Sequence, residues 1–300
     1  MSNLNKPTKV KLSSGDRIFY IGVDVMMIII GLLVAVPILH IISASISQPS
    51  AVTQGKVFLL PQGFSLEGYK AVFRDDNILS GYGNTILYTV LGTVINVCLT
   101  IAAAYPLSRK DMPGRNWIMF LFTFSMMFSG GLIPTYLLVR DLKMINTIWA
   151  LLLPYAINTY NMIVARTFFA STIPKELLEA TRIDGGDDFT FFFKVVVPLS
   201  KSIIAVLSLY YAVAAWNSYF SAFLYLNDQK KFPLQLVLRD ILIGNTMSSE
   251  MAESASVVQN DLSGILKYAS IICASLPVWI IYPIVQKHFV KGVMIGSIKG

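Results

Sequence analysis

Long runs of apolar residues, each about the length of a membrane-spanning helix, alternate with short polar segments along the chain. A helix needs about 20 mostly apolar residues to cross the hydrocarbon layer of a membrane. Six segments meet this requirement, and we expect transmembrane helices over residues 18–46, 84–107, 117–139, 147–169, 195–226 and 265–289. The pattern therefore predicts an all-α membrane protein with one transmembrane domain that covers residues 1–300.

The first apolar segment follows a basic stretch, from Lys6 to Arg17, and has the small-residue sequence Ser43–Ser45 near its end. Both features are also typical of a cleaved signal peptide. The apolar run is longer than the central region of a signal peptide, and five further apolar segments follow it. We therefore expect an uncleaved membrane anchor.

Composition supports the membrane class: 55% of the residues are hydrophobic and 14% are charged, whereas about a quarter are charged in soluble domains. The net charge of +7 would suit a nucleic-acid partner, but Lys and Arg on cytoplasmic loops explain the same excess, so no nucleic acid is expected. The shortest predicted loop, Ser108–Asn116, carries Arg109, Lys110 and Arg115. The positive-inside rule then places both termini in the cytoplasm, and residues 48–83 and 227–264 outside.

The sequence lacks the residues that several other functions require. The sequence has no GxxxxGKS/T phosphate-binding pattern, and its two histidines, His40 and His288, are far apart. We therefore expect no catalytic residue, no metal and no cofactor bound by this chain. The middles of the apolar segments are almost free of charge. This argues against an ion-coupled transporter, which binds ions or protons on ionisable groups inside the membrane, although a uniporter for a neutral sugar has a similar pattern.

One polar segment, residues 171–194, separates the fourth and fifth apolar runs. Six charged side chains occur between Glu176 and Asp188. Capping and turn preferences predict a short helix, a break and a second amphipathic run. The residues concerned are Ser171 or Thr172 as the N-cap, Pro174 in the first turn, Gly185 and Gly186 as the break, and Phe189–Val197 as the second run. An ordinary connector at the membrane interface has the same pattern.

This segment resembles the EAA motif of bacterial ABC-importer permeases. The matching spacing is Glu179-Ala180-Thr181, three residues, Gly185, nine residues, Val195, then Val197-Pro198; Thr181, Val195 and Val197 replace the motif's Ala, Ile and Leu. The stretch AAWNSYFSAFLYL, Ala214–Leu226, and the tail QKHFVKGVMIGSIKG, Gln286–Gly300, are similar to maltose-type carbohydrate permeases. The resemblance implies the six-helix fold of a type I ABC importer permease. Within that family, the chain looks most similar to the second permease subunit of importers for oligosaccharides and complex glycans.

The resemblance also implies the partners and the role of the polar segment. In this family the EAA segment is a coupling helix that docks on a separate ATPase. The implied partners are a homologous permease that completes a heterodimeric permease, two nucleotide-binding ATPase subunits and an extracellular sugar-binding protein, in a bacterial cell membrane. ATP and Mg are used by the ATPase, and this chain binds no cofactor. The coupling residues carried over are Glu179, Ala180, Thr181, Arg182, Asp184, Gly185 and Pro198.

Polar and aromatic residues in the fourth and fifth apolar runs are candidates for a sugar pathway, because rings stack on sugar faces and amides bind hydroxyls. They are Tyr155, Asn158, Tyr160, Asn161, Tyr210, Tyr211, Trp216, Asn217 and Tyr219. Interfacial aromatic belts and contacts between helices explain such residues equally well. The sequence FSGGLIP should interrupt the third helix, and we interpret Gly130, Gly131 and Pro134 as a hinge or gate.

Three alternatives remain open at this point. They are an ABC permease for a non-sugar solute such as a polyamine or phosphate, an ion-coupled transporter or channel, and a scaffold without a pathway. The EAA spacing and the lack of charge inside the membrane favour the carbohydrate importer over these alternatives. The sequence alone does not determine the identity or length of the sugar, or which permease subunit holds it.

Overall fold

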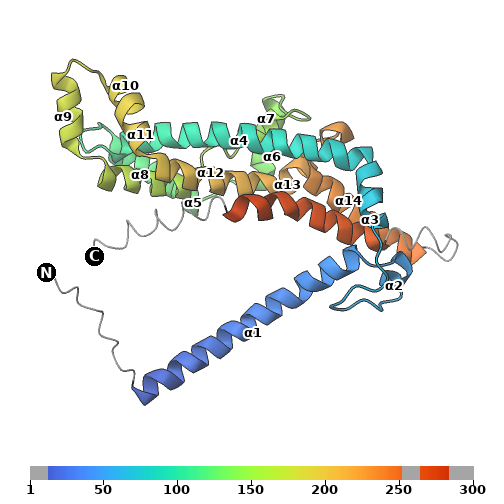
Figure 1. Ribbon diagram of the computed structural model, residues 1–300. Coiled ribbons are helices and arrows are strands. Elements are labelled where there is room, and N and C mark those ends of the chain that lie inside the picture. Colours follow the sequence, from blue (N-terminus) through green and yellow to red (C-terminus); the bar gives the residue numbers. More distant parts are fainter. Residues whose placement is uncertain (1–12, 252–263, 284–300) are drawn as a thin grey trace. The chain divides into compact units, whose positions relative to one another are not determined.

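The computed structural model describes residues 13–251 and 264–283, and the side chains of residues 13–243 and 264–283 (Figure 1). Nearly all regular structure in these residues is helical, and the strand-like pairing within them is an isolated bridge between Ser47 and Phe64. The predicted all-α class is confirmed. The tail Gln286–Gly300, which resembles carbohydrate permeases, lies outside the described residues.

The chain divides into two compact units, and the structure describes most of each. Residues 13–70 and 264–272 belong to the first unit, and residues 71–251 and 273–283 to the second. The helix Gly264–Pro283 contributes residues to both.

The first unit contains the long helix α1, Ser14–Ser45, which begins with a capping box between Ser13 and Asp16. Its side chains are exposed over most of its length, and Ser43, Ala44 and Ser45 at its end are buried. Ser43 Oγ donates to the carbonyl of Leu59 at 2.7 Å, which holds the following irregular segment against the helix end. An exposed apolar helix of 32 residues is compatible with lipid around it and not with water. The short helix α2, Pro49–Thr53, follows, and α3 covers Glu67–Arg74.

The second unit is built around α4, Asp76–Ser108, which Asp75 caps through the amides of Asn77 and Ile78. It packs along α8, Thr159–Thr172, and α12, Lys201–Trp216 (Figure 1). The core between them contains Val97, Ile101, Ala104, Tyr105, Leu107, Met162, Ala165, Phe169, Phe191, Val196, Ile203, Leu207 and Tyr211. From α4, this core includes residues of the C-terminal half only, between Val97 and Leu107.

Two of the predicted spans are bent pairs of helices. The third apolar run forms α5, Arg115–Met127, and α6, Leu132–Asp141, with a bend of 116° between them. Before α12, the chain forms α10, Asp188–Phe191, a π-helix over Phe192–Val196 and α11, Val197–Leu199, and this segment meets α12 at 77°. The break in the third run lies at the predicted glycines, whereas the helix expected over 195–226 is interrupted at Ser200 and again after Trp216.

The fourth apolar run is also interrupted, into α7, Trp149–Leu152, and α8. The continuous helix expected over 147–169 does not form, because Pro154 follows α7 and lacks the amide that would extend it. Asn158 then caps α8 through the amide of Asn161 at 3.1 Å. The fifth run ends with α13, Phe220–Tyr225, after a short break at Asn217.

Part of the predicted outer loop over 227–264 is helical: a 3₁₀ turn covers Gln229–Lys231, and α14 covers Leu234–Met251. The amide of Leu234 donates to Thr85 Oγ1 on α4 at 2.8 Å. By length and composition, three described helices can cross a membrane: Ser14–Ser45, Asp76–Ser108 and Gly264–Pro283. The number becomes five if each bent pair is one span, and the count of six stays a prediction.

Candidate functional site

The predicted coupling segment contains the helix α9, Lys175–Ile183, whose N-cap is Pro174. Our assignment of Ser171 or Thr172 as the N-cap was wrong, because both belong to the last turn of α8. Ser171 Oγ donates backward to the carbonyl of Phe168 at 3.2 Å. Pro174 disfavours the helical conformation at the residue before it, so Ile173 is extended and the chain starts a new helix after the proline.

The C-terminus of α9 is closed by a Schellman motif, which explains the two adjacent glycines. Gly185 has a φ of +77°. Its amide donates to the backbone carbonyl of Arg182 at 3.1 Å, and the amide of Gly186 donates to the backbone carbonyl of Thr181 at 2.8 Å. A residue with a side chain rarely adopts this φ. A Cβ on Gly186 would lie 2.7 Å from Thr181 Cγ2. Gly185 is therefore required by backbone conformation, and Gly186 by close approach to α9.

The two faces of α9 have different surroundings. Leu178 is half-buried and packs against the core around Tyr105, whereas Leu177, Ala180 and Ile183 are exposed, with 86% of Ile183 accessible. The carboxylate-bearing Glu179 is exposed as well. The outward surface of α9 therefore presents apolar groups next to a carboxylate, a composition that suits a protein partner.

The segment after Gly186 begins a new helix at Asp187, whose carboxylate accepts from the amide of Thr190 at 2.8 Å. The hydrogen bonds from Thr190 lower the pKa of Asp187. Pro198 lies two residues beyond the π-helix. Proline lacks an amide hydrogen and its ring clashes with the carbonyl four residues earlier, and the wider π-turn, with the amide of Val197 bonded to Phe192, accommodates it.

Arg109, the residue after α4, joins this segment to the basic loop. Its Nη1 lies 3.0 Å from Asp188 Oδ1, and its Nε donates to Asp111 Oδ1 at 3.0 Å. The hydrogen bond from Arg109 lowers the pKa of Asp111 to about 2. The same bond is the main reason that the pKa of Arg109 is raised above its usual range. Both groups therefore remain charged at neutral pH.

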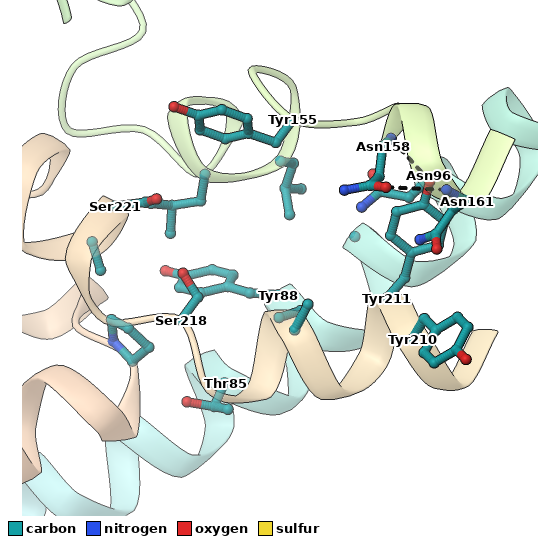
Figure 2. A pocket seen from close by; sticks show the side chains of 17 residues that line it. Thr85, Tyr88, Asn96, Tyr155, Asn158, Asn161, Tyr210, Tyr211, Ser218 and Ser221 are labelled. Carbon is teal, nitrogen blue, oxygen red and sulfur yellow. Dashed lines mark hydrogen bonds between the residues drawn. The ribbon is translucent and has the colours of Figure 1, made fainter. Parts of the chain in front are cut away.

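A cavity of about 240 Å³ lies in the second unit between α4, the α7–α8 segment and α12 (Figure 2). Five predicted pathway residues line it: Tyr155, Asn158, Asn161, Tyr210 and Tyr211. The Tyr211 hydroxyl bonds with Thr100 Oγ1 at 2.6 Å and accepts from the amide of Asn158 at 3.1 Å. None of the described residues that line the cavity is charged.

Four other predicted pathway residues do not line this cavity: Tyr160, Trp216, Asn217 and Tyr219. The indole of Trp216 is buried and donates to the carbonyl of Ala274 at 3.1 Å, so it holds α12 to the helix Gly264–Pro283. Asn217 Nδ2 donates to the carbonyl of Val213 at the end of its own helix. Tyr160 and Tyr219 are exposed at 56% and 45%. The position of each residue around its helix and its local hydrogen bonds direct these side chains away from the cavity. Neither can be read from the residue type alone.

The structure adds polar lining residues that we had not predicted: Thr85, Tyr88, Asn96, Ser218 and Ser221. The first three occupy one face of α4, at intervals of three and eight residues. Asn96 Oδ1 is buried without a hydrogen-bond partner among the described residues. Figure 2 shows Asn96 at the same end of the cavity as Asn158, Asn161 and Tyr211. The polar stripe on an otherwise apolar helix was the signal that sequence reasoning missed.

The predicted gate residues form the break between α5 and α6. Gly131 has φ of +89° and is the N-cap of α6, and Pro134 lies in the first turn of that helix. Gly130 lies in the irregular linker, and a Cβ on it would lie 3.8 Å from Pro134 Cβ. The interruption itself is a feature of the structure, and its role as a hinge or gate stays a prediction.

Residues 78–295 match the family model described as "Binding-protein-dependent transport system inner membrane component". The chain belongs to this family. It is a membrane permease of the ABC-importer class, and the resemblance based on the EAA spacing is confirmed.

Individual members of the family are similar over nearly their whole length. The polygalacturonan/rhamnogalacturonan transport system permease protein YtcP of Bacillus subtilis is 42% identical over 95% of this chain and 99% of its own. Protein LplC of the same species is 43% identical over 90% of this chain and 91% of its own. A chain in the crystal structure of a bacterial ABC transporter involved in the import of the acidic polysaccharide alginate is 36% identical, with a TM-score of 0.84 over 94% of this chain and all of that chain. The permease fold predicted from the motif is therefore confirmed.

Proposed function

We propose that this permease is one half of the membrane pathway of an ATP-driven importer for oligosaccharides. The observation that supports the substrate class is the uncharged cavity lined by amides, hydroxyls and phenol rings. Amides and hydroxyls exchange hydrogen bonds with sugar hydroxyls, and aromatic rings cover the apolar faces of sugar rings. The relatives named for polygalacturonan/rhamnogalacturonan transport and for alginate import point to the same class.

The cavity of about 240 Å³ is smaller than the roughly 300–1,000 Å³ of sites that enclose a whole small ligand. This chain therefore contacts a short part of the glycan, and the homologous permease subunit contacts the rest. The glycans in the relatives' names carry carboxylates, for which the described lining residues offer no cation. Pairing with those carboxylates belongs to the partner permease or to the sugar-binding protein.

The second part of the proposal concerns coupling. The helix α9 docks through its exposed side on a separate ATPase, which uses ATP and Mg, while this chain binds neither. The complex contains two such ATPase subunits, the homologous permease and an extracellular sugar-binding protein. The basic loop after α4 and α9 itself face the cytoplasm, together with both termini, as the positive-inside rule requires.

Purification from the native membrane tests the composition of the complex. An ATPase, a second permease and a sugar-binding protein should co-purify with the tagged chain. A chain that is isolated alone as a homo-oligomer and still transports would contradict the proposal.

Reconstituted vesicles then test the substrate and the energy source. Neutral and uronate-containing oligosaccharides are compared with a polyamine and with phosphate, with ATP inside the vesicles. Uptake of a glycan that requires ATP and persists after ion gradients are dissipated supports the proposal. Uptake of the polyamine or phosphate instead indicates the alternative ABC permease, and loss of uptake with the ion gradient indicates an ion-coupled transporter.

A further inference from the structure

Asp188, the first residue of α10, contacts guanidinium groups from two separate elements. Arg109 Nη1, at the end of α4, lies 3.0 Å from Asp188 Oδ1, and Arg182 Nη2, on α9, lies 3.4 Å from the same oxygen. Arg182, which the resemblance counts among the residues that contact the ATPase, is therefore engaged within its own chain. One carboxylate joins Arg109, at the start of the basic loop, to the helix on the other side of the glycine turn.

The Arg109–Asp188 contact is the stronger of the two by its surroundings. The side chain of Arg109 is 17% exposed, and its guanidinium is fixed on a second side by Asp111. A planar guanidinium held by two carboxylates loses little additional freedom when it binds. The longer Arg182–Asp188 contact joins side chains that are 54% and 53% exposed, so solvent weakens it more.

Close packing contributes little to the position of α9. Among the described residues, Leu178 is the residue of α9 that packs against the core of the second unit. A cavity of about 320 Å³ lies between the end of α4 and α9, and Arg109, Leu178 and Arg182 are among the residues that line it. Because this cavity takes the place of packed side chains, α9 makes fewer dispersion contacts with α4, and the ionic contacts take a larger share in holding the two elements together.

The glycine turn between α9 and α10 explains why the contacts of Asp188 are needed. Gly185 and Gly186 connect α9 to α10, and glycine backbones permit larger changes in φ and ψ than other residues. An α9 displaced by a partner would therefore move about this turn and leave α10 behind, unless a side-chain contact bypasses the turn. Asp188 provides that bypass, because it lies beyond the glycines and contacts α9 and α4 directly.

We infer that Arg182, Asp188 and Arg109 form a clamp that makes α9, α10 and the inner end of α4 move together when the ATPase displaces α9. The inference rests on the proposed docking of α9 on an ATPase. Because α4 also carries Thr85, Tyr88 and Asn96 into the cavity, the clamp connects the docking helix to the sugar site. Arg109 and Asp188 act as positioning residues and contact neither the sugar nor ATP.

The test compares three variants of the complete importer in vesicles: Asp188→Asn, Asp188→Glu and Asp141→Asn. The first removes the charge of the clamp, and the second keeps it on a longer side chain. The third removes the Arg140–Asp141 pair, which has a similar separation of 2.9 Å but joins neighbours in one helix. The measurements are sugar uptake, ATP hydrolysis and the amount of ATPase that co-purifies.

We expect Asp188→Asn to assemble fully and to hydrolyse ATP, while the sugar transported per ATP falls at least about fivefold, the lower range of coupling between sites. Asp188→Glu should recover most of this ratio, and Asp141→Asn should match the unaltered protein. Equal ratios in Asp188→Asn and Asp141→Asn would overturn the clamp. Loss of the ATPase from Asp188→Asn would overturn it too, because the clamp transmits movement and does not hold the partner. An unaltered chain that never binds an ATPase would instead refute the proposed function.

Discussion

Replacement of Asn96 by Leu separates a binding role of this residue from a structural one. Asn96 Oδ1 is buried and has no hydrogen-bond partner among the described residues, yet it borders the cavity. A buried polar atom without a partner costs about 1–3 kcal/mol. Leu has a similar size and no polar atom, so Asn96→Leu should leave the empty protein as stable as before or stabilise it by about 1 kcal/mol.

The same substitution removes one hydrogen bond to a bound sugar hydroxyl, which contributes about 1 kcal/mol. The sugar concentration at half-maximal uptake should therefore rise about fivefold, by the relation that 1.4 kcal/mol equals a factor of 10. Thermal unfolding of the purified complex gives the stability, and uptake of labelled oligosaccharide into vesicles gives the concentration dependence. Asn96→Leu should be neutral or favourable for stability and unfavourable for uptake.

Asn217→Leu is the matched control, because Asn217 lies outside the cavity and its Nδ2 donates to the carbonyl of Val213 at 2.8 Å. Its removal leaves that carbonyl without the side-chain bond, so stability should fall slightly while uptake is unchanged. An Asn96→Leu protein that is destabilised but takes up sugar with unchanged affinity would refute the binding role. The residue would then have a structural function in the helix bundle.

Three further predictions concern the turns and the buried hydroxyl. Gly185→Ala places a side chain at φ of +77° without a steric clash, so stability should fall by about 1 kcal/mol and uptake should fall with it. Gly55→Ala, at φ of +67° and equally free of clashes, should show the stability loss alone, and equal uptake in both variants would contradict the role of α9. Gly131→Ala should slow uptake at unchanged assembly, measured by co-purification, and a normal rate would remove the gate interpretation. Tyr211→Phe deletes the hydroxyl that is hydrogen-bonded to Thr100 and to the Asn158 amide. The free energy of unfolding, measured by thermal denaturation, should therefore fall by about 2 kcal/mol, whereas Tyr155→Phe should leave it unchanged.

The sequence by itself determined the class of protein and the place of two of its helix breaks. Apolar runs long enough to span a bilayer specify helices, because a backbone in lipid must satisfy its own hydrogen bonds. The break at Gly130–Gly131 and the end of α9 at Gly185 followed from local backbone preferences, which act without tertiary contacts. The EAA spacing is local in the same sense, so the family was recognisable before any fold was known.

The tertiary structure decided which polar residues meet. Apolar character alone does not give the rotation of a helix, so Trp216 and Asn217 looked like pathway residues although their side chains bond elsewhere. The cavity joins α4 to residues 55 to 148 positions further along the chain, and its α4 stripe became visible only when the neighbouring helices were in place. The Arg109–Asp188 contact likewise joins residues 79 positions apart. Packing of α4 against α8 and α12 brings these distant groups together, because side-chain shape and charge, which act over a few ångströms, select one arrangement of the helices.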